Sequence, residues 1–310
     1  MTPITEVEGR RLALSNLDKV LYPATGTTKG EVLHYYAATA AGALLAHLYN
    51  RPVSFLRYPD GPEGQRFFTK NPPPGTPSWV RTTPVPHQED SRARQVVVQD
   101  LASLMWAANL VVEFHTPQWQ ADAPAIADRM VFDLDPGAPA SVVECCTVAL
   151  WLRERLAADG LLTYGKTSGS KGLHLLVPLE PTPADRVSAY AKGLAVEAEL
   201  ELPELVVHRM TRALRPGKVF VDFSQNAASK TTATPYTLRA RPEPTVSAPV
   251  TWAEIEECRA PGQLAFLAGD MGARLERYGD LLGPLINPNR ARRLPAGLDP
   301  KASGIRPPGA

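Results

Sequence analysis

RMVFDLDPG, residues 129–137, predicts a β-strand that ends in a turn. Side chains alternate between the two faces of a strand, so its apolar residues are expected to face a core. Asp133 and Asp135 then project together from the other face, with their Cα atoms about 6.6 Å apart at ~3.3 Å per residue. Two acids on one face of an apolar strand are the strongest local signal in the chain.

The spacing of Asp133 and Asp135 favours a metal site. Two carboxylates this close repel each other, and one would keep its proton unless a cation lay between them. Carboxylate oxygens suit Mg²⁺ or Mn²⁺, and two such ions about 3.5–4 Å apart can hold both oxygens of a phosphoryl displacement. A simpler interpretation stays open: the strand ends in a polar turn, and Asp135 only caps the chain before Pro136-Gly137.

A second motif, KTSGSKGLH at residues 166–174, predicts a glycine-rich turn between two strands. Glycines let a backbone approach an anion, main-chain N–H groups can hold phosphate, and Lys171 adds positive charge. The spacing is not that of a Walker A loop, and no helix is predicted to follow. The alternative is an ordinary hairpin turn with a solvated lysine, in which His174 is a core histidine, a ligand or a phosphate donor.

Two further polar residues are predicted at the ends of apolar strands. Asp222 lies in VFVDFSQN (219–226). An acid there is costly to bury without a partner, and a shared metal ion would supply one. His115 ends VVEFH (111–115), where a single histidine is also compatible with a structural role.

The predicted strands occur in clusters with helices between them, which favours an α+β fold with mixed or antiparallel sheets flanked by helices. Capping boxes at Thr28–Glu31, Ser141–Glu144 and Thr251–Glu254 mark three helix starts. Residues 59–92, rich in proline and glycine, are expected to be mostly loop. The last helical stretch is expected to run from Thr251 to about residue 282.

The domain organisation predicted is a single catalytic unit with a tail. No linker separates two clean halves, so residues 1–285 are expected to form one composite domain. Residues 286–310 are rich in proline and arginine and are expected to be extended or frayed.

Composition excludes several classes of protein. With 33 Lys and Arg against 32 Asp and Glu, the 310 residues carry a net charge of +1, which excludes a histone-like basic protein. A nucleic-acid enzyme is still allowed, because residues 205–245 hold seven Lys and Arg against two acids. Three cysteines cannot form a disulfide framework, and the sequence has no signal peptide or membrane-spanning run. A cytoplasmic protein without a membrane partner is expected.

Taken together, three acids at strand ends, a glycine-lysine turn and a basic segment favour phosphoryl or nucleotidyl transfer on a nucleic acid. A metal-dependent phosphoesterase using Asp133, Asp135, His174 and Asp222 fits the same residues. A non-catalytic module that binds DNA ends is a third interpretation, although it needs no converging acids.

In combination, FDLDPG, KTSGSKGLH, VFVDFSQN and PYTLRARP (235–242) resemble the polymerase domain of bacterial DNA ligase D, within the archaeo-eukaryotic primase superfamily. The resemblance begins at LSNLDKVLYP (14–23) and continues to about residue 282. It implies an archaeo-eukaryotic primase-like catalytic core. It also implies a two-metal DNA repair polymerase that fills short gaps at broken ends and usually favours ribonucleotides. Position 170 is serine where the family often has glycine.

The resemblance implies a role for each matching residue. The implied catalytic acids and metal ligands are Asp133, Asp135 and Asp222. The implied nucleotide-binding residues are His115, Ser168, Lys171, Gly172, His174, Gln225 and Arg239. The implied DNA contacts are Asn16, Lys19 and Lys29 at a downstream 5′-phosphate, Phe67 and Phe68 against template bases, and Arg215 in a loop at the primer end.

The resemblance also implies the cofactor and the partners. The cofactor is a pair of Mn²⁺ or Mg²⁺ ions. The partners are nucleoside triphosphates, gapped or broken DNA carrying a 5′-phosphate, bacterial Ku and a separate DNA ligase, since no Lys-x-Asp-Gly adenylation motif is present. The protein is expected to be cytoplasmic and associated with the bacterial nucleoid. A stand-alone primase or gap-repair polymerase outside end joining is the alternative.

The implied 5′-phosphate pocket requires a particular fold at the N-terminus. Lys19 and Lys29 lie ten residues apart and can meet only if the turn that begins at Asn16 packs against the helix start at Thr28. A phosphate there would also meet the free N–H groups of the helix N-terminus. The alternative is two ordinary solvated lysines.

Overall fold

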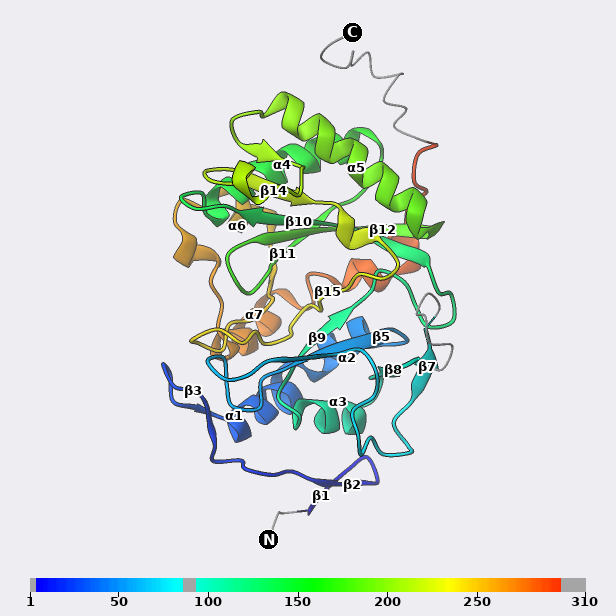
Figure 1. The fold of residues 1–310 in the computed structure, drawn as a ribbon, viewed down its shortest axis with the longest axis vertical. Helices are drawn as coiled ribbons and strands as arrows, with labels where there is room; N and C mark the ends of the chain where they lie inside the picture. The colour runs from blue at the N-terminus through cyan, green and yellow to red at the C-terminus, as the bar shows by residue number, and fades with distance from the viewer. Residues whose placement is uncertain (1–3, 86–92, 297–310) are drawn as a thin grey trace.

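Two six-stranded sheets lie one above the other in the computed structural model, which describes residues 4–85 and 93–296 (Figure 1). Sheet I has the strand order β13-β14-β10-β12-β11-β16, and of its pairs β13–β14 is parallel and the rest antiparallel. Its strands are β10 (Ile126–Pro136), β11 (Tyr164–Thr167), β12 (Leu173–Pro183), β13 (Val206–Val207), β14 (Val219–Asp222) and β16 (Pro249–Val250). Helices α4 (Val142–Ala158) and α5 (Ala184–Glu201) cover the face that points away from sheet II (Figure 1).

The alternation along β10 sets which face of sheet I is apolar. Met130, Phe132 and Leu134 are fully buried in one core with residues of α4 and α5. Burying side chains of this size stabilises the fold by about 1.5–3 kcal/mol each. The intervening residues Asp133 and Asp135 are left on the opposite face, toward sheet II. The predicted strand and its phase are confirmed.

Sheet II has the order β15-β9-β5-β8-β7, with β6 paired to β5 beside this path. Its strands are β5 (Pro52–Arg57), β6 (Phe67–Thr69), β7 (Thr82–Pro84), β8 (Arg94–Val97), β9 (Val112–Thr116) and β15 (Thr232–Ala233). Helices α1 (Lys29–His34), α2 (Ala41–Leu48) and α3 (Leu101–Ala108) pack on the side of sheet II away from sheet I (Figure 1). Sheets flanked by helices confirm the predicted α+β class.

Capping boxes begin the helices as predicted. Both hydrogen bonds of the box are present at Thr28 with Glu31, at Ser141 with Glu144, and at Thr251 with Glu254. The helix that begins at Thr28 is interrupted by a π-helical segment, Tyr35–Ala40, which separates α1 from α2. This segment places Tyr35 Oη 2.8 Å from the main-chain oxygen of Tyr236, a residue 201 positions later.

The chain crosses between the two sheets more than once. After β14 in sheet I, it adds β15 to the edge of sheet II, where Ala233 pairs with His115. Helix α7 (Met271–Tyr278) then returns to sheet II, and Met271 is buried in the core of that sheet. Neither half of the molecule is therefore built from one continuous part of the chain.

A buried ion pair joins the two sheets. Asp128 on β10 accepts hydrogen bonds from Arg51, just before β5, and from Gln120, at 3.0 Å. Its other oxygen lies 3.3 Å from Nε of Arg129, and both arginines are at most 3% exposed. Burial would raise the pKa of Asp128, but the two guanidinium groups lower it to about 2.

The described part of the stretch 59–92 is mostly loop, as predicted, although it contains the short strands β6 and β7; residues 86–92 lie outside the described part of the chain. Two regions differ from the sequence prediction. The C-terminal helical stretch is broken into α6 (Trp252–Glu256), short 3₁₀ turns and α7, because Pro261 and several glycines interrupt it. Part of the tail is packed on the domain: Arg292 bridges Leu179 on β12, and Leu294 is 2% exposed.

Two short hairpins complete the described strands: β1–β2 (Ile4–Val7 and Arg10–Ala13) and β3–β4 (Val20–Tyr22 and Thr27–Thr28). Across the described ranges, none of the helices has the length and apolar character needed to cross a membrane.

Candidate active site

Four polar residues line up across the middle of sheet I. The register places Asp133 opposite Asp222 on β14 and opposite His174 on β12, and His174 opposite Lys166 on β11. Residues directly opposite one another on neighbouring strands share a face of the sheet. The row from Asp222 to Lys166 therefore lies on the face turned toward sheet II.

Asp133 and His174 form the centre of this row. Nε2 of His174 lies 3.3 Å from Oδ1 of Asp133. Burial alone would raise the pKa of Asp133, but His174 and the charge of Lys166 hold it below its ordinary value. Burial and the same lysine lower the pKa of His174. Asp133 is therefore ionised at neutral pH.

Lys166 ends the row and is a site residue that the sequence analysis did not assign. Its side chain is fully buried, and Nζ donates to Oγ of Ser247 at 2.6 Å. Burial and the charge of Arg239 lower the pKa of Lys166 to about 7, while Asp133 opposes this shift. Lys166 could have been assigned to the site from the sequence, because it is the first residue of the KTSGSKGLH motif and a hairpin would place it opposite His174.

Asp135 lies one pleat further along β10 and is surrounded by cations. Nζ of Lys171 lies 3.1 Å from its Oδ1, and Nη1 of Arg215 lies 3.8 Å from its Oδ2. The Arg215 guanidinium also lies over the ring of Phe220, 3.8 Å from the ring centre. The segment that carries Arg215 packs tightly on the turn after β10, since a Cβ at Gly137 would lie 2.1 Å from the Arg215 main-chain oxygen.

Asp222 adjoins the other acids through the backbone ladder, but its carboxylate has its own partners. Oδ1 accepts from the main-chain N–H of Ser224 at 2.9 Å and from its hydroxyl at 2.6 Å. Oδ2 accepts from Nε2 of Gln225 at 2.8 Å. The carboxylate is therefore held by the turn that follows β14.

The donor chemistry of these acids fits a divalent cation. Three carboxylates on one face offer the hard oxygen ligands that Mg²⁺ and Mn²⁺ prefer. In the part of the chain that the structure describes, no three His, Cys, Asp or Glu side chains already surround a common point. The acids do not converge because each has other partners: Asp222 is hydrogen-bonded to Ser224 and Gln225, and Asp135 forms an ion pair with Lys171.

The glycine-rich turn is closed by Ser168. Its Oγ accepts from the N–H groups of Ser170, at 3.2 Å, and Gly172, at 3.1 Å. Two of the N–H groups expected to hold phosphate are thus already satisfied. Gly172 is required because a Cβ there would lie 2.2 Å from the Leu134 oxygen on β10. Strand β12 follows the turn directly, so the prediction that no helix follows is confirmed.

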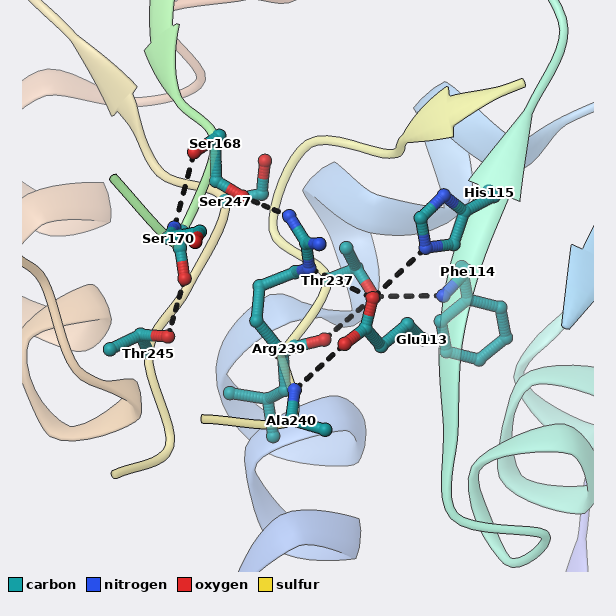
Figure 2. Close-up of polar contacts among 12 residues, drawn as sticks. Glu113, Phe114, His115, Ser168, Ser170, Thr237, Arg239, Ala240, Thr245 and Ser247 are labelled. Carbon is teal, nitrogen blue, oxygen red and sulfur yellow. Dashed lines mark hydrogen bonds and ion pairs between the residues drawn. The ribbon is translucent and has the colours of Figure 1, made fainter. Parts of the chain in front are cut away.

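Sheet II contributes a second group of polar residues that meets the turn (Figure 2). Glu113 on β9 accepts from Nε2 of His115 at 3.0 Å and from Nε of Arg239 at 2.8 Å. Arg239 also donates from Nη1 to the main-chain oxygen of Ser168. The segment 237–241 therefore connects β9 of sheet II with the turn of sheet I.

These residues surround a cavity of about 270 Å³ between the two sheets. Most of the predicted site lines it, namely His115, Asp133, Asp135, Ser168, Lys171, Gly172, His174, Gln225 and Arg239. Asp222 is absent from this lining, although it pairs with Asp133 in the ladder.

Further residues of the lining were missed in the sequence analysis: Ser170, Thr231, Thr232, Ala233 and Arg241. Arg241 could have been found, because it stands two residues after Arg239 in a basic motif. The stretch 231–233 enters the site by pairing with β9 and carries no local signal of this.

The N-terminal turn packs against α1, as the phosphate pocket requires. The N–H of Lys29 donates to the Lys19 oxygen, and the N–H of Gly30 to the Leu17 oxygen, both at 2.8 Å. Burial and the charge of Lys19 lower the pKa of Lys29. Nζ of Lys19 lies 2.7 Å from Oδ1 of Asp60. The two lysines are thus neighbours.

One expectation about this turn was wrong. The first N–H groups of α1 are not free, because Lys29 and Gly30 donate to the turn itself and Glu31 donates to the Thr28 hydroxyl. Asn16, with a φ of 55°, accepts at its main-chain oxygen from the N–H of Lys19 at 3.0 Å.

Phe67 and Phe68 lie on β6, at the edge of sheet II, and are 42% and 57% exposed. β5 separates them from β9 and His115. They are two exposed aromatic rings on an ordered strand rather than in a loop, and they lie outside the cavity.

Comparison with known proteins agrees with this architecture. A family model described as the LigD primase-polymerase domain matches residues 28–282. The chain is 42% identical over 283 residues to the multifunctional non-homologous end joining DNA repair protein LigD of Mycobacterium tuberculosis, covering 88% of this chain and 37% of that protein. It is 43% identical over 280 residues to LigD of Mycolicibacterium smegmatis, covering 89% of this chain and 36% of that protein. The chain thus spans little more than a third of the length of these relatives.

The fold is similar to that of a solved structure. The polymerase domain of Mycobacterium tuberculosis ligase D in complex with DNA matches with a TM-score of 0.84 and 42% identity, covering 89% of this chain and 98% of that one. The archaeo-eukaryotic primase-like core implied by the sequence motifs is confirmed. The chain therefore belongs to the LigD primase-polymerase family of DNA-directed nucleotidyltransferases.

Proposed function

We propose that the chain is a template-dependent repair polymerase that fills short gaps at DNA ends. One observation carries this most directly: Asp133 and Asp135 share a single cavity with Lys171 and Arg239. Acids that suit divalent cations thus lie beside cations that suit a triphosphate, as transfer of a nucleotidyl group requires.

One group of cavity residues is proposed to bind the nucleotide, and the acids are proposed to bind the metal ions. Lys171, Arg239 and the Ser168 turn bind the triphosphate, with His115, His174 and Gln225 around the nucleotide.

Two Mn²⁺ or Mg²⁺ ions held by Asp133, Asp135 and Asp222 would supply Lewis acids for the triphosphate and for the primer 3′-hydroxyl. Asp135 contacts Lys171, and Asp222 contacts Ser224 and Gln225, so binding of the ions would require these contacts to be replaced. Lys171 would then be available to the triphosphate.

The DNA contacts lie around this centre. Lys19, Lys29 and Asn16 form a pocket for the 5′-phosphate of the downstream strand. Phe67 and Phe68 expose aromatic faces on which template bases stack. Arg215, beside Asp135, acts at the primer end.

The biological setting follows from the relatives. Since these are bacterial proteins of non-homologous end joining, we infer that the chain works at broken or gapped DNA in the cytoplasm, at the nucleoid. Bacterial Ku and a DNA ligase are its proposed partners. Preference for ribonucleotides belongs to the same proposal.

A single experiment tests the proposal. Labelled primer on a template with a one-nucleotide gap and a downstream 5′-phosphate is incubated with the protein, Mn²⁺ and a complementary ribo- or deoxynucleotide. We expect extension by one nucleotide, faster with the ribonucleotide, and none after chelation of the metal. Shortening of the primer would support a phosphoesterase, and binding without either change would support an end-recognition module. Extension of open templates but not of gaps would support a primase outside end joining.

A further inference from the structure

Glu113 is a buried acid with no place in the roles assigned above. It is 3% exposed and lies on β9 two residues before His115, on the same face of the strand. A buried carboxylate is costly unless its oxygens are satisfied. Its position in the cluster is shown in Figure 2.

Both oxygens of Glu113 are used by other residues of the protein. Oε2 accepts from Nε2 of His115 at 3.0 Å and from Nε of Arg239 at 2.8 Å, and Oε1 accepts from the N–H of Ala240 at 2.8 Å. Glu113 itself does not line the cavity, whereas His115 and Arg239 do. Glu113 can therefore affect a nucleotide in the cavity only indirectly, through His115 and Arg239.

The contacts fix the plane of the Arg239 guanidinium. Nε is held by Glu113 from sheet II, and Nη1 by the main-chain oxygen of Ser168 from the turn of sheet I. On the far side, a Cβ at Gly169 would lie 2.6 Å from Cγ of Arg239, so the arginine stem packs closely on the turn. A long side chain thus has its rotamers restricted before it binds an anion.

The same carboxylate determines the proton on His115. Burial would raise the pKa of Glu113, but His115 and Arg239 outweigh it and lower that pKa to about 2. An ionised carboxylate only accepts, so Nε2 of His115 must carry a proton. Burial and the charge of Arg239 lower the pKa of His115, which leaves Nδ1 unprotonated.

We propose that Glu113 is a positioning residue for the incoming nucleotide, which orients Arg239 toward the triphosphate and holds His115 as the Nε2–H tautomer. The inference rests on the proposed polymerase function and adds a residue that acts only through others. Glu113 also connects the two sheets at this cavity. Its partner His115 lies on β9 of sheet II, and its partner Arg239 donates to the main-chain oxygen of Ser168 in the turn of sheet I.

The test is Glu113→Gln, which keeps the shape and removes the charge. The amide oxygen replaces only one carboxylate oxygen, so the NH₂ group faces either the N–H of Ala240 or both His115 and Arg239, and in both cases the negative charge that holds Arg239 is lost. We expect the KM for the nucleotide in single-gap extension to rise about 10- to 100-fold, with kcat within a few-fold of wild type and affinity for gapped DNA unchanged. An unchanged KM would overturn the proposal.

Glu254→Gln is the matched control. Glu254 is a partly buried carboxylate that does not line the cavity. It accepts from the two terminal nitrogens of Arg274, at 2.5 and 3.0 Å, and from the N–H and hydroxyl of Thr251. This variant should lose comparable thermal stability and keep the wild-type KM. An equal rise of KM in Glu254→Gln would show that Glu113 acts only through general stability.

A double-mutant cycle separates positioning from an independent effect. In an Arg239→Ala background, Glu113→Gln should raise the KM by less than about three-fold, because its main partner is already gone. Full additivity of the two effects would contradict the proposal.

A spectroscopic measurement on wild type does not depend on any variant's folding. Imidazole nitrogen-15 chemical shifts, with the signal assigned by its loss in His115→Gln, should show His115 as the neutral Nε2–H tautomer at pH 7.5. The Nδ1–H tautomer would overturn the proposal. If wild type fails to extend any primer while His115 shows the Nε2–H form, the polymerase function falls and the Glu113 contact stands.

Discussion

Nζ of Lys171 lies 3.1 Å from Oδ1 of Asp135 and 2.8 Å from the main-chain oxygen of Pro136, so the lysine of the glycine-rich turn already rests against one of the two acids. Under the proposed function, a triphosphate would compete with Asp135 for this ammonium, and a divalent cation would compete with the ammonium for Asp135. Binding of one would therefore favour binding of the other.

Lys171→Ala should therefore weaken nucleotide binding. Loss of a charged hydrogen bond of about 1.5–3 kcal/mol corresponds to a rise in KM of roughly 10- to 150-fold. Steady-state extension over a range of nucleotide concentrations measures it. Lys192→Ala, an exposed residue of α5, is the control and should leave the KM unchanged. The same KM in both variants would leave Lys171 as a solvated lysine of an ordinary turn.

Asp133→Asn should abolish extension while gapped DNA still binds, since the phosphate contacts are made elsewhere. We expect kcat to fall by at least about 10²- to 10³-fold, the effect of removing one strong electrostatic contact to the transition state. Rapid-quench extension and a separate DNA-binding titration distinguish the two effects. The surface substitution Asp185→Asn on α5 is the control. Substantial extension by Asp133→Asn would contradict its role as a metal ligand.

The pocket of Lys19 and Lys29 should give wild type a higher affinity for gapped DNA with a 5′-phosphate than with a 5′-hydroxyl. Lys19→Ala combined with Lys29→Met should remove that preference, and extension of a simple recessed primer should be largely kept. Fluorescence anisotropy with the two DNAs measures it. Equal affinity of wild type for both would exclude the pocket.

Asp60→Asn tests the same pocket in the opposite direction. Asp60 is exposed and holds Nζ of Lys19 at 2.7 Å, so it competes with a phosphate. Removing its charge should strengthen the 5′-phosphate preference by about two- to five-fold, the scale of an exposed ion pair. A weaker preference would show that Asp60 supports the lysine rather than competing for it.

Asp128 should make stability depend on pH. Its pKa is lowered to about 2 in the folded protein, so its stabilisation is complete above the unfolded value of about 4 and is lost as pH falls toward 2. Asp128→Asn should cost about 2–4 kcal/mol at pH 7, because Arg51 and Arg129 remain buried, and less at pH 3. Urea unfolding at the two pH values measures this. A cost that does not shrink in acid would refute the assignment.

Features that depend only on neighbouring residues, such as strand alternation and helix capping, could be predicted from the sequence. The alternation from Met130 to Asp135 gave the strand, its buried face and the paired acids, since strand periodicity needs no knowledge of partners. The capping box at Thr28 similarly gave a helix start, although the π-helical segment after it depends on contacts with distant Tyr236.

Long-range pairings could not be predicted in this way. Glu113 and Arg239 meet across 126 positions, and nothing in the sequence around either residue indicates the other. The strand at Phe67 exists because it pairs with β5, and a proline- and glycine-rich segment carries no sign of that. The orientation of Asp222 likewise depends on Ser224 and Gln225, not on the strand that carries it.

Because the chain crosses between the two sheets, the order of synthesis limits when sheet II can finish folding. Most strands of sheet II leave the ribosome early, but β15, which completes its edge beside His115, and Met271, which completes its core, are among the later parts of the chain. A nascent chain that ends near residue 200 lacks both pieces, so it cannot complete the edge or the apolar core of that sheet. The sheet built mainly from the N-terminal part of the chain can therefore reach its final packing only after residues beyond 270 have been synthesised.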